Sequence, residues 1–244
     1  MNNDWRLLRC GKGSAAWNMA LDEAIYRLVS EGIVPPTLRL FRWSPPAVSI
    51  GRFQTVELPE IQEYLNHGYP LVRRPTGGLA VLHESDLSYS ITGRVGEEGL
   101  PRSPRALYQQ AHEALRQALQ ARGIPLKLYS GVEGQSTAGL CNAVPMRSDL
   151  VVHGGEKIGG SAQIRGEGVV LQHGCVHVPT VVNWSQFESE VAVAFKRTMG
   201  LPLAEGSLAS EEVALANSLV ANKYGRDEWN RNGIGCCEEA HGMC

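Results

Sequence analysis

Positive charge is not in excess in this sequence. Its 23 lysines and arginines stand against 25 aspartates and glutamates, which gives a formal net charge of −2. Proteins that bind nucleic acid rely on clustered lysine and arginine to neutralise phosphates. The charge balance therefore argues against nucleic acid as the main partner.

Long apolar runs are missing as well. None approaches the roughly 20 residues that a membrane-spanning helix needs, and the first residues, Met1 to Trp5, lack the basic start of a secretion signal. We therefore expect a cytoplasmic protein that does not bind a membrane. The 6 cysteines are few and irregularly spaced, and in such a chain they are more often free thiols than a disulfide framework.

The last residues are polar and rich in cysteine. Cys236, Cys237, His241 and Cys244 are of metal-ligand type, but their spacing fits no common zinc pattern, so we expect no metal. The length of 244 residues suits one large core. We expect a single domain over residues 1–230, followed by a flexible tail over 231–244.

Short strands mixed with helices predict an α+β fold built on a mostly antiparallel sheet flanked by helices. Leu87, Tyr89 and Ile91 alternate as in a strand, whereas Leu107, Ala111, Leu115 and Leu119 repeat as in an amphipathic helix. We expect helices over residues 15–31, 59–67, 103–122, 184–199 and 210–224, and strands over 5–8, 37–43, 47–50, 71–74, 80–83, 86–92, 126–129, 150–152 and 168–178.

The stretch from Cys141 to Gly174 has the strongest signs of a site. Cys141 follows a Gly/Ser-rich segment, 130–140, that we expect to be mobile. Gly154-Gly155 predicts a two-residue hairpin turn, after which Lys157 opens the returning strand. A nearby ammonium stabilises a thiolate, the nucleophilic form of cysteine. We predict Cys141 and Lys157 as catalytic residues, beside a run of small residues that a substrate can approach closely: Gly159, Gly160, Ser161 and Ala162.

A second candidate site follows a strand that ends in Arg73 and Arg74. Two arginines can neutralise an anion, and the adjacent glycines let backbone N–H groups reach it. The alternative, a purely structural arginine pair beside a tight turn, remains open. The residues concerned are Arg73, Arg74, Thr76, Gly77, Gly78 and His83.

Cys175 is the rival thiol. It alternates with His173 and His177 along a strand. We expect these histidines to face away from the thiol, which disfavours a cysteine–histidine pair at this point.

Together these motifs resemble the lipoate–protein ligase, octanoyltransferase and biotin–protein ligase superfamily. Residues 73–83 look like its arginine–glycine lipoyl-binding loop, residues 157–162 like its lysine strand, and residues 223–230 like a closing motif. The resemblance implies a biotin/lipoate ligase-like catalytic domain. It also implies substrate contacts by Arg73, Arg74, Thr76, Gly77, Gly78, His83, Gly159, Ser161, Ala162 and His173.

Within the superfamily the chain is most similar to the ligase-like, cysteine-dependent octanoyltransferases. These carry a cysteine shortly before the lysine strand, a Ser-Ala-Gln-x-Arg run like residues 161–165, and a Gln-His-Gly run like residues 172–174. The implied reaction moves octanoyl from octanoyl-acyl carrier protein to Cys141 and then to a lysine of a lipoyl domain or of the glycine-cleavage H protein. No cofactor is needed, because a thioester is already activated, and backbone N–H groups of residues 159–162 would help to hold the oxyanion.

Three alternatives remain open. An ATP-dependent lipoate ligase would use ATP and Mg, with Lys157 on the adenylate. An octanoyl amidotransferase would use the same cysteine with another protein as donor. From a different class, the chain could be a lipoyl-domain binding protein without activity. Octanoyl and lipoyl chains are of similar length, so the sequence does not choose between them.

Overall fold

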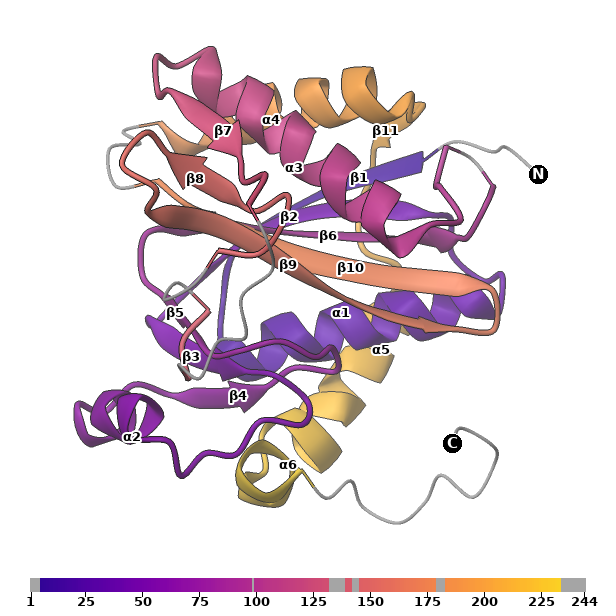
Figure 1. Ribbon diagram of the computed structural model, residues 1–244. Coiled ribbons are helices and arrows are strands. Elements are labelled where there is room, and N and C mark those ends of the chain that lie inside the picture. The colour runs from indigo at the N-terminus through magenta and orange to yellow at the C-terminus, as the bar shows by residue number, and fades with distance from the viewer. Residues whose placement is uncertain (1–4, 98, 132–138, 142–144, 179–182, 234–244) are drawn as a thin grey trace.

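The computed structural model describes residues 5–97, 99–131, 139–141, 145–178 and 183–233 (Figure 1). It contains an eight-stranded sheet in the order β11-β1-β2-β6-β10-β9-β8-β7 and a three-stranded sheet in the order β4-β3-β5. In the spatial order β2-β6-β10-β9-β8-β7 every neighbouring pair is antiparallel. At the other end of the sheet, β1 pairs in parallel with β2 and β11. The predicted α+β class with a mostly antiparallel sheet is confirmed.

Most strands agree with the sequence pattern, but β1 runs on to Gly13 instead of ending at Leu8, and β11 was not predicted. In the large sheet they are β1 (Trp5–Gly13), β2 (Thr37–Trp43), β6 (Asp86–Arg94), β7 (Leu126–Leu128), β8 (Leu150–Val152), β9 (Lys157–Gly166), β10 (Val169–His177) and β11 (Leu203–Glu205). In the small sheet they are β3 (Ala47–Ile50), β4 (Leu71–Arg73) and β5 (Val81–His83).

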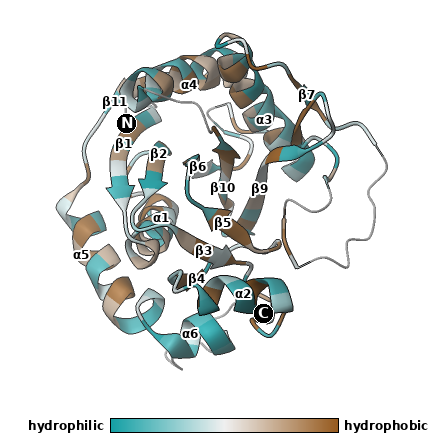
Figure 2. Ribbon diagram, turned by 90° about the vertical axis from the view of Figure 1, so that its left-hand side faces the viewer, coloured by the Kyte–Doolittle hydropathy of each residue, from teal (hydrophilic) through white to brown (hydrophobic). Residues whose placement is uncertain are grey.

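Helices cover both faces of the large sheet. They are α1 (Ala15–Ser30), α2 (Pro59–Asn66), α3 (Pro104–Gln120), α4 (Trp184–Met199), α5 (Ser210–Leu219) with its π-helical continuation η1 (Val220–Tyr224), and α6 (Asp227–Asn232). Figure 2 shows the central strands between α3 and α4 on one side and α1 on the other. None of the helices in the described part of the chain is long and apolar enough to cross a membrane.

The helices on each face of the large sheet pack against it and form a separate hydrophobic core. The stripe of α3 that the sequence predicts, Leu107, Ala111, Leu115 and Leu119, packs with Phe187, Val191 and Phe195 of α4. On the other face, Met19, Leu21 and Ile25 of α1 pack with Leu219 and Tyr224. Burying these side chains removes apolar surface from water, the main favourable contribution to folding.

The turn between β8 and β9 differs from the prediction. Val152 N–H donates to Glu156 O at 3.0 Å and Gly155 N–H donates to Val152 O at 2.9 Å, so three residues, 153–155, form the turn. Only Gly155 takes a positive φ, 86°. The pairing with β8 is also irregular between Leu150 and Val151. A two-residue turn was therefore the wrong prediction, although Lys157 does open β9 as expected.

Two predictions concern segments that lie wholly or partly outside the described residues. The expected mobile segment 130–140 is described only at 130–131 and 139–140, and the cysteine-rich tail only up to residue 233. Because α6 continues to Asn232, regular structure extends past the predicted domain end at residue 230.

Candidate active site

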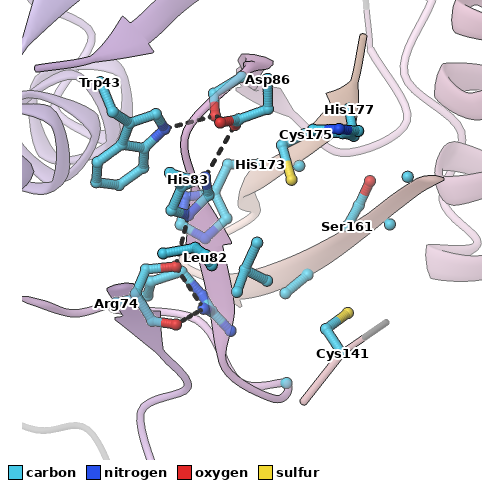
Figure 3. A pocket seen from close by; sticks show the side chains of 18 of the residues that line it. Trp43, Arg74, Leu82, His83, Asp86, Cys141, Ser161, His173, Cys175 and His177 are labelled. Atoms are coloured by element: carbon cyan, nitrogen blue, oxygen red, sulfur yellow. Dashed lines mark hydrogen bonds and ion pairs between the residues drawn. The ribbon is translucent and has the colours of Figure 1, made fainter. Parts of the chain in front are cut away.

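A pocket opens where the small sheet faces strands β9 and β10 of the large sheet. Figure 3 shows Cys141, Ser161 and Cys175 on one side of it and Arg74, His83 and Trp43 on the other. The two candidate regions of the sequence, residues 73–83 and 141–174, therefore meet around one cavity.

Cys141 and Lys157 lie in direct contact, as the sequence predicts. Lys157 Nζ donates to Cys141 Sγ at 3.0 Å. The same ammonium is 2.7 Å from Asp149 Oδ2, and both charged side chains are almost fully buried. Burial alone would lower the pKa of Lys157, but the charges of Cys141 and Asp149 raise it above the usual lysine value. Lys157 is therefore a permanent cation beside the sulfur.

Gly160 makes room for this lysine. A Cβ at Gly160 would lie 2.9 Å from Lys157 Cε and 3.0 Å from its Nζ. Real Cβ atoms avoid such distances, so a side chain at this position would displace the ammonium. The small-residue run thus serves the lysine as well as access to the pocket.

Backbone pairing ties Cys141 to the Arg–Gly loop, which we define as residues 74–80. Cys141 N–H donates to Ala80 O at 2.8 Å, Ala80 N–H donates to Gly139 O at 3.2 Å, and Leu140 forms a parallel bridge with Ala80. The nucleophile candidate is therefore held by the same loop that carries the arginine–glycine motif.

The side chain of Arg74 is hydrogen bonded to backbone carbonyls of that loop. Its guanidinium donates to Ser49 O, Ser49 Oγ, Gly77 O and Leu79 O at 2.8 to 3.0 Å. Burial lowers the pKa of Arg74 to about 10, partly opposed by Cys141, so it remains positive at neutral pH. Arg74 and Gly78 both line the pocket.

Arg73 does not line the pocket, in contrast to its predicted substrate contact. Its side chain donates to the backbone carbonyls of residues 51, 52, 54, 229 and 231, and its own N–H donates to Asn230. Neighbouring residues of a strand point to opposite faces, so Arg73 and Arg74 diverge. Arg73 anchors α6, which is the structural role left open in the sequence analysis.

His173 joins three segments beneath the pocket. Its Nδ1 lies 3.1 Å from Asp22 Oδ2 of α1, and its Nε2 lies 2.6 Å from Thr76 Oγ1 in the Arg–Gly loop. His173 lines the pocket, whereas Thr76 is buried behind it. Burial lowers the pKa of His173 despite the neighbouring carboxylate.

Cys175 also faces the cavity, together with His173 and His177. The expectation that these histidines face away from it is wrong, because residues two apart in a strand share a face. Burial raises the pKa of Cys175 well above its usual value. Cys175 is therefore a neutral thiol at ordinary pH and a poorer nucleophile than a thiolate.

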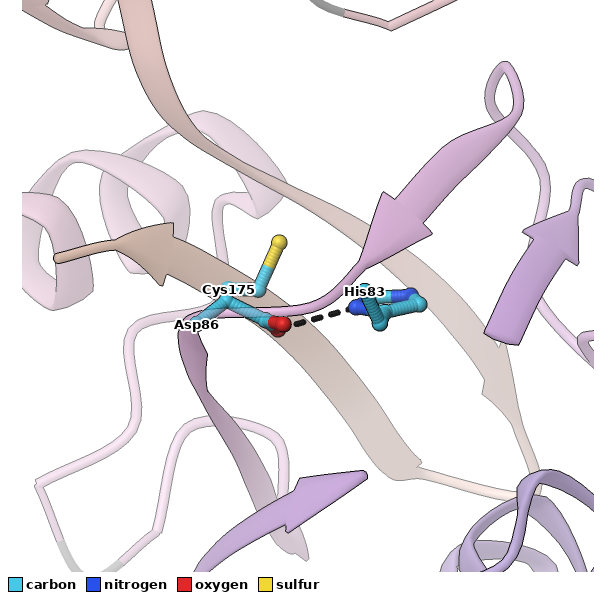
Figure 4. A group of neighbouring side chains, drawn as sticks. All are labelled: His83, Asp86 and Cys175. Carbon is cyan, nitrogen blue, oxygen red and sulfur yellow. Dashed lines mark hydrogen bonds and ion pairs between the residues drawn. The ribbon is translucent and has the colours of Figure 1, made fainter. Parts of the chain in front are cut away.

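Cys175 forms a compact group with His83 and Asp86 (Figure 4), whose ligand-type atoms lie within 4.8 Å of one another. His83 Nδ1 is 2.8 Å from Asp86 Oδ2, and its Nε2 is 2.8 Å from Ser49 Oγ. Both ring nitrogens are thus already hydrogen bonded. A metal ion would have to break one of these bonds, so the group does not resemble an open ligand set.

Ser161 is held in a directed hydrogen-bond network. His112 Nδ1 donates to the Ser148 carbonyl at 2.6 Å, since a carbonyl can only accept. Burial lowers the pKa of His112 to about 4, so its Nε2 is an acceptor for the Ser161 hydroxyl, at 2.6 Å. Tyr89 OH then donates to Ser161 Oγ at 2.5 Å. The serine therefore presents an acceptor, rather than a proton, to the pocket.

The buried His112 should make stability fall with acid. The folded protein excludes a proton that the unfolded chain binds below its ordinary pKa of about 6.5, so stability is lost as pH falls from there toward 4. We expect His112→Gln to remove about 1 to 2 kcal/mol of the loss between pH 6.5 and 5. Chemical denaturation of both proteins at several pH values measures this, and equal losses would contradict it.

Several residues of the site escaped the sequence analysis. Tyr108 and His112 lie on α3, and Asp22 lies on α1. Asp149 is the residue immediately before β8. The one available signal was that Tyr108 and His112 lie next to apolar positions of an amphipathic helix, where polar side chains need partners.

Comparisons with known proteins identify the family of this chain. The family described as the lipoyl protein ligase A/B catalytic domain matches residues 14–194. The chain is similar to octanoyltransferase LipM of Symbiobacterium thermophilum, with 35% identity over 94% of this chain and 99% of that protein. It is similarly close to octanoyltransferase LipM of Kyrpidia tusciae, with 36% identity over 93% and 98%.

Among solved structures, lipoate-protein ligase A bound with ATP superposes with a TM-score of 0.78 and 25% identity, covering 95% of this chain and 100% of that one. This likeness confirms the predicted ligase-like fold. The chain therefore belongs to the lipoyl protein ligase A/B catalytic domain family and, within it, to the octanoyltransferase group.

Proposed function

We propose that this protein transfers an octanoyl group from octanoyl-acyl carrier protein to a lysine of a lipoyl domain or of the glycine-cleavage H protein. The observation that carries the proposal is the contact at 3.0 Å between Lys157 Nζ and Cys141 Sγ, at the wall of the pocket. The names of the similar octanoyltransferases support the acyl group.

The reaction has two steps. The Cys141 thiolate attacks the thioester carbonyl, a C–S bond forms, and the carrier thiolate leaves with the electron pair of its own C–S bond. The ε-amine of the acceptor lysine then attacks the acyl-cysteine, loses a proton to solvent, and releases the Cys141 thiolate. Lys157 can stabilise that thiolate when it attacks and when it leaves, because the raised pKa of Lys157 keeps the lysine charged. Both bonds broken are thioesters, so the chemistry consumes no ATP.

One of the backbone N–H groups that were expected to hold the oxyanion is already hydrogen bonded. Of the four N–H groups of residues 159–162, that of Ser161 donates to Tyr108 OH at 3.2 Å. It is therefore occupied in the resting protein.

We expect the octanoyl chain to gain most of its binding free energy from burial of its apolar carbons. Seven apolar carbons at about 0.8 kcal/mol each contribute roughly 5 to 6 kcal/mol. Met19, Phe41, Leu82 and Ile158 supply apolar surface to the pocket. A lipoyl chain would gain a similar amount, so chain burial alone does not separate the two acyl groups.

Two rival activities make different demands on the site. A lipoate ligase would turn Lys157 toward an adenylate, but here its ammonium contacts Cys141 and Asp149. This contact favours a cysteine-dependent transfer. An amidotransferase would use the same cysteine, with an octanoylated protein in place of the acyl carrier protein.

Intact-mass measurement tests the proposal. The protein is incubated with octanoyl-acyl carrier protein without ATP, quenched in acid and weighed, and then mixed with lipoyl domain. We expect one octanoyl group on the enzyme, released by hydroxylamine and passed on to the acceptor. Acylation of the acceptor only with ATP and free acid would instead show a ligase, and acylation only from octanoylated H protein an amidotransferase.

A further inference from the structure

Tyr108 occupies a junction between α3, the residues before β8, and β9. Its hydroxyl is hydrogen bonded to Asp149 Oδ1, and the Ser161 backbone N–H donates to the Tyr108 hydroxyl oxygen at 3.2 Å. The directions are fixed, since a carboxylate only accepts and a backbone N–H only donates. Burial, together with Asp149, raises the pKa of Tyr108, so the phenol stays protonated and donates a hydrogen bond to Asp149.

Asp149 connects Tyr108 to Lys157, the residue that contacts the sulfur of Cys141. Its Oδ2 accepts from Lys157 Nζ at 2.7 Å and from Met146 N–H at 2.6 Å. Lys157 donates in turn to Cys141. One continuous set of hydrogen bonds therefore leads from the β9 backbone through Tyr108, Asp149 and Lys157 to Cys141.

We propose that Tyr108 is a positioning residue that sets how much of the Lys157 charge is available to the Cys141 thiolate. It acts through Asp149 alone. By donating to Oδ1, Tyr108 neutralises part of the carboxylate charge, so Asp149 competes less strongly with the sulfur for the ammonium. Without the hydroxyl, Asp149 would hold Lys157 more tightly and would repel the thiolate more strongly.

Other charged or titratable groups also face the sulfur. Arg74 from the Arg–Gly loop and Cys175 from β10 interact electrostatically with Cys141, and His112 interacts with Asp149 and Lys157. Neither Arg74 nor Cys175 bonds to Tyr108 in the described part of the chain, and the Tyr108 ring packs on His112 with centroids 4.2 Å apart. A Tyr108→Phe change keeps that ring and removes only the hydroxyl.

The test follows the pH dependence of Cys141 alkylation by iodoacetamide, with the modified peptide identified by mass spectrometry. For Tyr108→Phe we expect the midpoint of the profile to rise by about 0.5 to 1 pH unit relative to the native protein. Because no acyl donor is present, the result does not depend on the proposed function. An unchanged midpoint overturns the proposal.

Tyr89→Phe is the matched control. Tyr89 also bonds Ser161, through the serine hydroxyl at 2.5 Å, but among the described residues its hydrogen-bond partners are Ser161 and Gln172, not Asp149. Its loss should leave the alkylation midpoint in place, so an equal rise in Tyr89→Phe would reduce Tyr108 to a general structural residue.

Two further experiments extend the test, and the first of them does not depend on the folding of Tyr108→Phe. Site-specific 3-fluorotyrosine at position 108 keeps the hydroxyl and makes it a stronger donor, so it should move the midpoint downward. In an Asp149→Asn background the tyrosine has no carboxylate to neutralise, and Tyr108→Phe should then cause no further shift. A shift of undiminished size in that background would contradict action through Asp149.

Discussion

A Cys141→Ser protein is expected to transfer octanoyl at least about 10³-fold more slowly than the native protein. The serine hydroxyl stays neutral at working pH and has no base to take its proton. Lys157, the ionisable group hydrogen bonded to Cys141, is itself held as a cation by its surroundings. The ammonium that favours a thiolate therefore cannot activate an alcohol. The initial rate from octanoyl-acyl carrier protein to a lipoyl domain measures the loss.

Serine variants of two other cysteines serve as comparisons for this result. Cys10 lies on β1, where it accepts from Arg39 Nε at 3.4 Å, away from the pocket lining. Cys10→Ser should leave the transfer rate within a few-fold of native. Cys175→Ser changes the pocket wall and addresses the rival thiol. If Cys175→Ser abolished transfer while Cys141→Ser retained it, the assignment of the nucleophile would be wrong.

Lys157→Met should have the second largest effect, on both rate and stability. The thiolate loses its only hydrogen-bonded cation within the described residues, and we expect acyl transfer to fall by about 10²-fold. Asp149, whose side chain is 0% exposed, is left as an unpaired buried carboxylate. Removing one partner of a buried pair typically costs about 3 to 5 kcal/mol. Single-turnover acylation and chemical denaturation measure the two losses separately.

The double variant Lys157→Met/Asp149→Asn distinguishes the two consequences. It removes both charges, so part of the lost stability should return, because no buried charge remains unpaired. The acylation rate should stay low, because the sulfur still lacks its cation. Recovery of the rate along with the stability would show that Lys157 supports the fold and not the chemistry.

The parts of the site that are local in sequence were predictable. Cys141 and Lys157 are only 16 residues apart and lie on either side of β8, so the sequence alone favoured a contact between them. The small-residue run and the glycine pair of the Arg–Gly loop likewise follow from their own sequence. Elements such as α4, whose bounds match the prediction, depend on a strong helical period within a single segment.

The parts that depend on packing between distant segments were not predictable from one sequence. Tyr108 and Asp149 are 41 residues apart, and Asp22 and His173 are 151 apart. Which side chains meet at such separations depends on sheet order and helix placement, which periodicity does not specify. The divergence of Arg73 and Arg74 is different, since strand alternation already implies that only one of them can face the pocket.

The polar side chains around the pocket bond to one another. Arg74 donates to Ser49, Ser49 bonds His83, His83 bonds Asp86, and Trp43 reaches the same carboxylate through Ser88. A water molecule entering the cavity would find these groups already engaged. Although its wall carries charged residues, the cavity should therefore be poorly wetted, and the proposed acyl-cysteine would hydrolyse slowly enough to wait for its acceptor.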